Sequence, residues 1–123
     1  MEIKFRGKQV DSGEWYVGFY AKGRHGGHYI LSEYNGLATN AHSVDGYTVG
    51  RYTSLKDKRG MEIFEGDIVK RHGLIYRAKF GAGCFWLVRN LSSSLILIAK
   101  NCPHTEVIGN IHDNPEMLKE AAA

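Results

Sequence analysis

Short runs of alternating apolar and polar residues, separated by turns rich in glycine, serine and asparagine, dominate residues 67–111. In residues 74–81 apolar side chains occupy every second position, and Arg77 and Lys79 stand between them. A period of two is the repeat of a β-strand with one buried face. Five such runs in about 50 residues predict five strands that close, or nearly close, into a small barrel without exposed sheet edges.

The same alternation occurs near the N-terminus. Residues 3–6 alternate, residues 14–21 place Trp15, Val17 and Phe19 on one face, and glycine-containing turns flank them. This pattern predicts a β-hairpin followed by a third short strand at residues 28–32. Residues 33–46 mix asparagine, glycine, serine and aspartate with little periodicity, which predicts a loop.

The loop is also the predicted boundary in the chain. We expect N-terminal strands and a variable loop in residues 1–47, and a β-barrel with a helix in residues 48–123. The barrel itself should lie within residues 48–112, with the N-terminal strands packed beside it. The two parts are compatible with one compact unit, because 123 residues suffice for about one domain.

The period changes at the C-terminus, in the sequence DNPEMLKEAAA. Asn114 is the expected N-cap, and Pro115 is the expected first helical residue. A helix this short is marginal alone, so Met117 or Leu118 should dock on the sheet. The predicted fold class is therefore all-β, with one short C-terminal helix.

The predicted core takes the apolar face of each strand. Its members are Phe5, Trp15, Ile68, Leu74, Tyr76, Phe80, Trp86 and Val107.

The segment TSLKDKRGMEIFEGDIV, residues 53–69, gathers four carboxylates. We interpret Asp57 and Asp67 as hydrogen-bond acceptors for turns in which Gly60 or Gly66 supplies a positive φ. The alternative is a catalytic acidic pair, which requires two carboxylates in one desolvated site. Glu62 and Glu65 stand near Lys56, Lys58 and Arg59 in sequence, which favours a solvated segment. The segment is thus predicted to be structural.

Composition is that of an ordinary globular protein, with 43% apolar and 24% charged residues. The net charge of +3 is too small to require nucleic acid as a partner. Residues 1–10 contain no apolar core of a signal peptide, and the longest apolar run, residues 95–99, is too short to span a bilayer. We therefore expect a cytoplasmic protein with reduced thiols and no membrane partner.

The six histidines and two cysteines suggest a zinc site, but their spacing is unfavourable. His25 and His28 are the closest pair, and a zinc site would need two more ligands from Cys84, Cys102, His104 or His42 at no recognised spacing. We expect no metal, no cofactor and no disulfide. Paired with a histidine, Cys84 would be a nucleophile. Its alternation with Trp86 and Val88 predicts a buried, inert thiol instead.

Four cations recur on successive predicted strands: Lys70, Arg77, Lys79 and Arg89. Cations and aromatic side chains on one barrel face bind single-stranded nucleic acid through phosphate contacts and base stacking. The polar face of a half-buried sheet has the same composition, and both interpretations remain open.

Four segments carry a resemblance to a known family: EIKFRGK, GEWYVG, TVGRYTSLKDKRGMEIFEGDIV and EVIGNIHDNPEMLKE. Together they resemble the YopX family of phage and prophage proteins over nearly the whole chain. That family usually has a glycine where Ser54 stands, and often an asparagine where Arg59 stands. The resemblance implies an all-β protein with an SH3-like barrel in its C-terminal part, a phage or prophage origin and a bacterial cytoplasm. It implies no reaction and no catalytic residues.

Two function hypotheses follow. One is a non-catalytic accessory factor that binds a host or phage protein through the barrel and the variable loops. The other is a nucleic-acid-binding β-barrel module. A homo-oligomer is compatible with both, and an enzyme is not expected.

Overall fold

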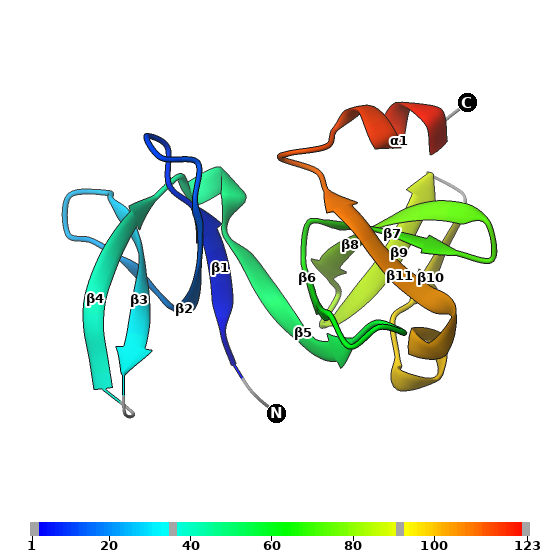
Figure 1. Cartoon of the computed structure of the whole chain (residues 1–123), viewed down its shortest axis with the longest axis horizontal. Coiled ribbons are helices and arrows are strands. Elements are labelled where there is room, and N and C mark those ends of the chain that lie inside the picture. The colour runs from blue at the N-terminus through cyan, green and yellow to red at the C-terminus, as the bar shows by residue number, and fades with distance from the viewer. Residues whose placement is uncertain (1–2, 35–36, 91–92, 122–123) are drawn as a thin grey trace. The chain divides into compact units, whose positions relative to one another are not determined.

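The structure is a computed structural model that describes residues 3–34, 37–90 and 93–121. It contains two compact units, Met1–Tyr52 and Thr53–Ala123. Strands predominate in both units, so the all-β prediction is confirmed (Figure 1). The division between the units falls inside strand β5 (Gly50–Lys56), whereas the predicted boundary lay between residues 47 and 48.

The first unit is an antiparallel sheet in the order β4-β3-β2-β1-β5. Its strands before β5 are β1 (Phe5–Lys8), β2 (Trp15–Lys22), β3 (His28–Tyr34) and β4 (Leu37–Val44), and the 3-10 turn η1 (Gly46–Thr48) follows β4. The predicted loop over residues 33–46 is wrong, because residues 37–44 form β4 and pair with β3. This ladder supplies the backbone hydrogen bonds of a segment whose own sequence has little alternation.

One face of this sheet is buried around Ile30 and Val44. The register places Tyr20 and His42 opposite Ile30, so the even-numbered residues of β2 share this face. Val17 and Phe19 lie on the other face and are 45% and 47% exposed. The sequence predicted the reverse for β2, because its odd-numbered positions are the more apolar ones.

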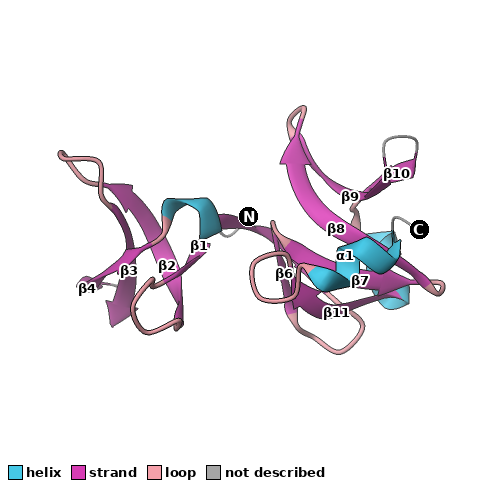
Figure 2. Cartoon of the chain, turned by 90° about the horizontal axis from the view of Figure 1, so that it is seen from above, coloured by secondary structure: helices cyan, strands magenta, loops and turns pink. Residues whose placement is uncertain are grey.

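The second unit contains a five-stranded antiparallel sheet in the order β10-β9-β8-β7-β11 (Figure 2). Its strands are β7 (Asp67–Arg71), β8 (Leu74–Gly81), β9 (Cys84–Asn90), β10 (Ser93–Ile96) and β11 (Thr105–Asn110). The short β6 (Glu62–Phe64) pairs with β5. The five strands predicted within residues 67–111 are therefore confirmed. The SH3-like form of the barrel and the packing of the N-terminal strands beside it stay predictions.

Tight turns join the central strands. His72 and Gly73 connect β7 to β8, and Ala82 and Gly83 connect β8 to β9. All four residues have positive φ, from 50° to 79°. Positive φ at both central positions is the type I′ turn that matches the twist of a hairpin. The hairpin predicted at His72 and Gly73 is confirmed.

The core of the second unit is a single cluster of buried side chains, most of them from the strands that these turns connect. Its buried members are Ile63, Val69, Tyr76, Ala78, Phe85, Leu87 and Leu97. In β9 the buried side chains are thus Phe85 and Leu87, and the predicted inward face with Cys84, Trp86 and Val88 is wrong. Residues 84–88 are apolar at every position, so their alternation does not distinguish the two faces.

The other predicted core residues divide into three groups. Ile68 and Tyr76 are buried; Phe5, Trp15, Trp86 and Val107 are half-buried; Leu74 and Phe80 are exposed. The prediction for Leu74 and Phe80 is wrong because both stand near the ends of β8, beside its hairpin turns. Tyr76 and Ala78, at the centre of the same face, are buried.

The C-terminal helix α1 (Glu116–Ala121) packs against β8, and Met117 and Leu118 are half-buried as predicted. The side chain of Asn114 does not cap the helix. Its Oδ1 accepts a hydrogen bond from Asn110 N in the preceding turn. A 3-10 helix, η2 (Ala99–His104), joins β10 to β11. No helix formed by the described residues is long and apolar enough to cross a membrane.

Ser54 has a left-handed backbone inside β5, with φ at 67°. Only glycine adopts this region without the clash of a Cβ atom, and other L-residues lose roughly 1–2 kcal/mol there. The glycine usual at this position in the YopX pattern fits this backbone. Ser54 therefore has the left-handed backbone that glycine would adopt at this position, and not the extended backbone usual for serine in a strand.

We expect Ser54→Gly to be more stable than Ser54→Ala by about 1 kcal/mol, because both lose the hydroxyl and only glycine relieves the strain at positive φ. Urea unfolding of the two variants measures the difference. Equal stabilities, or a more stable alanine variant, would contradict a left-handed backbone at residue 54.

Candidate functional site

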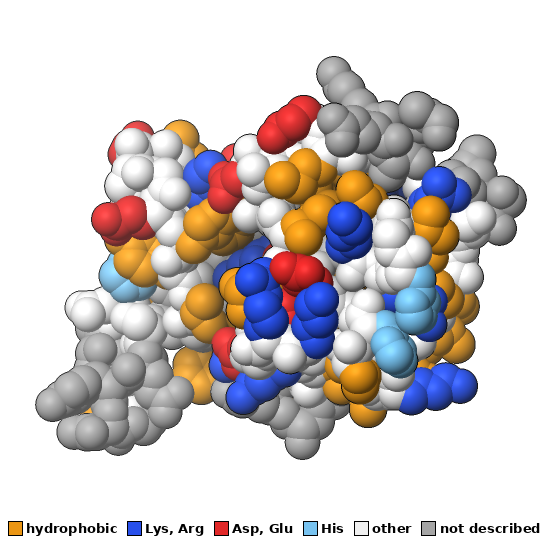
Figure 3. All heavy atoms as spheres, turned by 45° about the vertical axis from the view of Figure 1, so that its right-hand side comes forward, with side chains coloured by type: hydrophobic (Ala, Val, Ile, Leu, Met, Phe, Trp, Pro, Cys, Tyr) orange, Lys and Arg blue, Asp and Glu red, His pale blue; other side chains and the backbone are white. Residues whose placement is uncertain are grey.

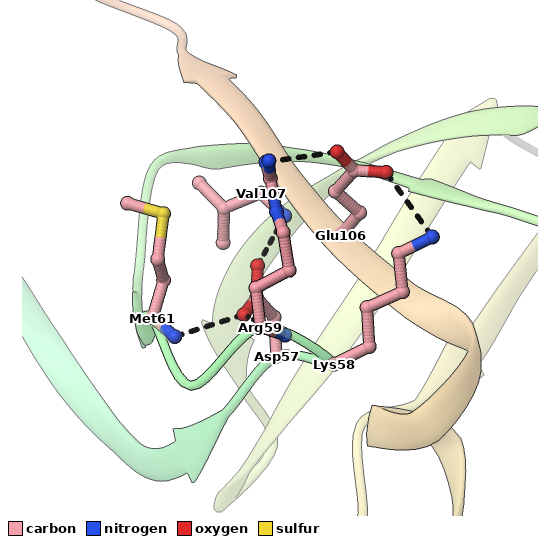
Figure 4. Close-up of polar contacts among 6 residues, drawn as sticks. All are labelled: Asp57, Lys58, Arg59, Met61, Glu106 and Val107. Carbon is pink, nitrogen blue, oxygen red and sulfur yellow. Dashed lines mark hydrogen bonds and ion pairs between the residues drawn. The ribbon is translucent and has the colours of Figure 1, made fainter.

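Asp57 is a buried carboxylate that binds three backbone N–H groups. Its Oδ1 accepts hydrogen bonds from Arg59 N at 2.9 Å and from Met61 N at 2.8 Å. Its Oδ2 accepts one from Val107 N at 2.9 Å, fifty positions further along the chain. Figure 4 shows the carboxylate between the loop that contains Met61 and strand β11. The side chain therefore closes its own turn and ties that turn to the edge of the sheet.

Charged side chains surround this junction on its solvent side. Lys58 Nζ lies 3.3 Å and Arg59 Nη2 lies 2.8 Å from the carboxylate of Glu106 on β11 (Figure 4). Both cations are about half exposed, and exposed ion pairs of this kind contribute roughly 0–1 kcal/mol. A buried donor that loses its acceptor costs about 1–3 kcal/mol. The hydrogen bonds to Asp57 are therefore the larger contribution.

In the second turn of residues 53–69 an aspartate side chain again accepts a backbone hydrogen bond. Asp67 is buried, and its Oδ2 accepts a hydrogen bond from Phe64 N at 2.7 Å. Gly60 and Gly66 have φ of 85° and 95°, which closes the two turns. The prediction that both aspartates and both glycines serve turns is confirmed. Of the two glutamates, Glu65 makes a long contact of 3.4 Å with Phe80 N.

The pKa of Asp57 reflects this environment. Burial opposes ionisation, but the hydrogen bonds from Val107, Met61 and Arg59 and the charge of Arg59 outweigh it. The pKa therefore lies below the ordinary value of 3.8. The ionised side chain contributes stability at a pH above the ordinary value, and that stability is lost as the pH falls through the lowered pKa.

Three of the four candidate cations share one face of the second unit. The register pairs Lys79 with Trp86 and Arg77 with Val88, and Lys70 lies on the same side because Ile75 is opposite it. Arg89 lies where the register between β9 and β10 shifts, so the alternation of β9 does not assign it to this face. Its Nε is buried without a hydrogen-bond partner among the described residues. Lys70 and Lys79 are exposed.

Charge is mixed on one face of the molecule. On the face shown in Figure 3, cationic side chains lie among acidic ones and do not form a patch of one sign. Lys70 itself stands opposite Glu106 in the ladder. Arg77 and Lys79 lie on the same face as Trp86. The indole is fixed there by a hydrogen bond of 2.9 Å from Nε1 to Gly81 O.

Two histidines of the first unit belong to its buried face. Tyr20 Oη and His28 Nδ1 are 2.6 Å apart, and Ser32 Oγ and His42 Nε2 are 3.1 Å apart. The ring of His42 also stacks on Tyr16, with centroids 3.7 Å apart. The strand predicted to begin at residue 28 is confirmed, because His28 is the first residue of β3. The signal that sequence reasoning missed is the alternation of Tyr16, Gly18 and Tyr20 on β2.

An open depression of about 400 Å³ lies at one end of this unit, lined by His28, Asp45, Gly46 and Tyr47. Asp45 Oδ1 accepts a hydrogen bond from Tyr47 N, and His28 is bound to Tyr20. The polar groups around the depression thus serve the turn η1 and the sheet.

The cysteines are free thiols, and both are half-buried. Cys84 lies on the face with Trp86 rather than in the core. Burial, and next the charge of Asp57, raise the pKa of the Cys102 thiol, which lowers its reactivity at neutral pH. Within residues 3–34, 37–90 and 93–121, no three histidine, cysteine, aspartate or glutamate side chains are placed to hold one metal ion.

Comparisons with known proteins point to one family. A family model described as YopX protein matches residues 4–119. Protein EF1440 from Enterococcus faecalis has a similar structure, with a TM-score of 0.65, 23% sequence identity, and coverage of 96% of this chain and 99% of that chain. At this identity the likeness supports the fold alone. A search of curated proteins finds no match.

We expect Asp57→Asn to lower the free energy of unfolding at pH 7 by about 1–3 kcal/mol, because the amide group of asparagine faces a backbone N–H that has lost its acceptor. Urea unfolding followed by Trp86 fluorescence, in a Trp15→Phe background, reports the second unit. The wild type should lose this advantage as the pH falls below about 4. The control is Asp11→Asn, which is exposed and should change little. Equal losses in the two variants would contradict the role of Asp57.

Proposed function

The chain belongs to the YopX family, and from this premise we propose that it is a phage- or prophage-encoded accessory protein that acts as a non-catalytic protein-interaction module in the bacterial cytoplasm. Asp57 and Asp67, in one of the segments that resemble the family, accept backbone hydrogen bonds, which agrees with a scaffold role. The observation that carries the proposal is an exposed apolar row on the first unit.

Val17 and Phe19 are neighbours on the same face of β2, and close to half of each side chain is exposed. The register continues the row sideways from Phe19 to Leu31 on β3 and Ala41 on β4. An apolar row across three neighbouring strands is larger than a single scattered side chain. Contiguous exposed apolar surface of this kind is typical of interaction sites.

The surroundings of the row define its partner. Arg6 on β1 is opposite Val17, and its guanidinium carbon lies 4.9 Å from the centroid of the Trp15 ring. Lys8 is opposite Trp15. These two side chains of β1 border the apolar row, and Nε and Nη2 of Arg6 are buried. The best match is a protein surface with apolar side chains at its centre.

We expect Val17→Ser/Phe19→Ser to reduce recovery of a host or phage protein at least about tenfold in a nuclease-treated pull-down with the full chain, because a tenfold change needs only about 1.4 kcal/mol. The matched control is Ile96→Ser/Ile98→Ser, which removes two apolar side chains of 46% and 42% exposure from the second unit. Equal recovery with both double variants would contradict the assignment to β2.

The second candidate function is binding of single-stranded nucleic acid by the second unit. The specific observation in its favour is the direct pairing of exposed Lys79 with Trp86, which combines a phosphate contact with a stacking surface. Arg77 lies on the same face, two residues before Lys79.

For this candidate, Lys79→Ala should weaken retention on single-stranded DNA and reduce the slope of log affinity against log salt by about 0.7, the value for one phosphate contact on a single strand. Lys100→Ala, an exposed lysine on η2, is the control. Binding that is absent at low salt, or an identical slope in both variants, would exclude this function.

A further inference from the structure

Strand β4 is the open edge of the sheet in the first unit. It stands last in the strand order, with β3 on its inner side, and both views show it at the outside of its sheet (Figures 1 and 2). Alternate residues of an edge strand direct N–H and C=O groups away from the sheet, where another strand can pair with them. From Asn40 to Val44 the ladder with β3 is regular, so the outer side of this stretch is also straight.

The second unit protects its own edges. β10 has only four residues and a register shift after Ser93. At β11 the loop that follows Asp57 covers the edge: Lys58 N donates to Thr105 O, and Asp57 accepts from Val107 N. A register shift near Gly109 interrupts the remainder of β11. Short length, irregular register and a covering loop are the usual means by which proteins prevent pairing of edges.

β4 has a different character. Its eight residues, LATNAHSV, contain no lysine, arginine, acidic residue or proline. Ala41 and Ser43 are exposed and small, so they leave room for a neighbouring strand. The only irregularity in its ladder lies at the far end, opposite Ser32 and Glu33.

These differences between β4 and the edges of the second unit indicate which strand pairs with β4. We propose that β4 pairs in antiparallel fashion with β4 of a second copy of this chain, which joins the two first-unit sheets. A two-fold contact places the same surface on both sides, and an uncharged strand meets its own copy without opposing like charges. The row that runs from Phe19 through Leu31 ends at Ala41, so pairing there extends its apolar surface across the new contact. The pairing uses the backbone edge of β4, whereas the partner proposed for β2 contacts the face of the sheet.

Sedimentation of the full chain from about 1 μM to about 1 mM tests this pairing, since an interface of one strand pair is small and weak. We expect a concentration-dependent shift from 13.8 kDa to twice that mass. Ser43→Lys should weaken the dimer at least tenfold, because a charged residue on the edge opposes pairing. Ser94→Lys is the matched control, an exposed serine on β10, an edge strand of the second unit, and it should leave the dimer unchanged.

Hydrogen exchange distinguishes this pairing from other contacts and from misfolding. Amides on the outer side of residues 40–44 should exchange more slowly at high than at low protein concentration in the wild type, and at one rate in Ser43→Lys. The proposal would be overturned if the protein is a monomer at all concentrations. The same holds if β4 pairs only with a strand of another protein. A dimer whose β4 amides do not respond to concentration would also overturn it.

Discussion

The buried carboxylate of Asp57 joins the turn at residues 57–61 to strand β11 through backbone hydrogen bonds. It accepts backbone hydrogen bonds from Arg59, Met61 and Val107 while it is 6% exposed. Two of these close the turn that leads into β6, and the third attaches that turn to β11 near the end of the chain. Its ionised form is favoured because three donors replace the water that burial removes. This one carboxylate therefore supports both the turn and its attachment to β11, beside the backbone bonds of the turn and the ladder between β11 and β7.

Much of this architecture was predictable from local pattern. Glycine and aspartate in DKRG and FEGD predicted two tight turns, and both turns form. The alternation between residues 67 and 111 predicted five strands. The local pattern does not predict contacts between distant parts of the chain. Nothing in the sequence of the turn indicates that Val107 donates the third hydrogen bond to Asp57. The glycine usual at residue 54 in the family was the one sign of the left-handed backbone that Ser54 adopts.

The errors have a common physical cause. Residues 84–88 are apolar on both faces of β9, so the choice between Trp86 and Leu87 for the core is made by the neighbouring strands. On β2 the tyrosines face Ile30 and the more apolar Val17 and Phe19 face outward. β4 is a strand only because β3 pairs with it. In each case tertiary pairing outweighed intrinsic preference. The two surfaces to which we assign interactions, on β2 and along β4, lie where the pattern was misinterpreted.

The most direct test of this account is an NMR titration that follows the Asp57 carboxyl carbon and the Val107 amide together. The account predicts a pKa below 3.8 for Asp57, and an amide shift of Val107 with the same midpoint although fifty positions separate the two residues. A midpoint at or above 3.8, or a Val107 amide that does not respond to the titration, would contradict it.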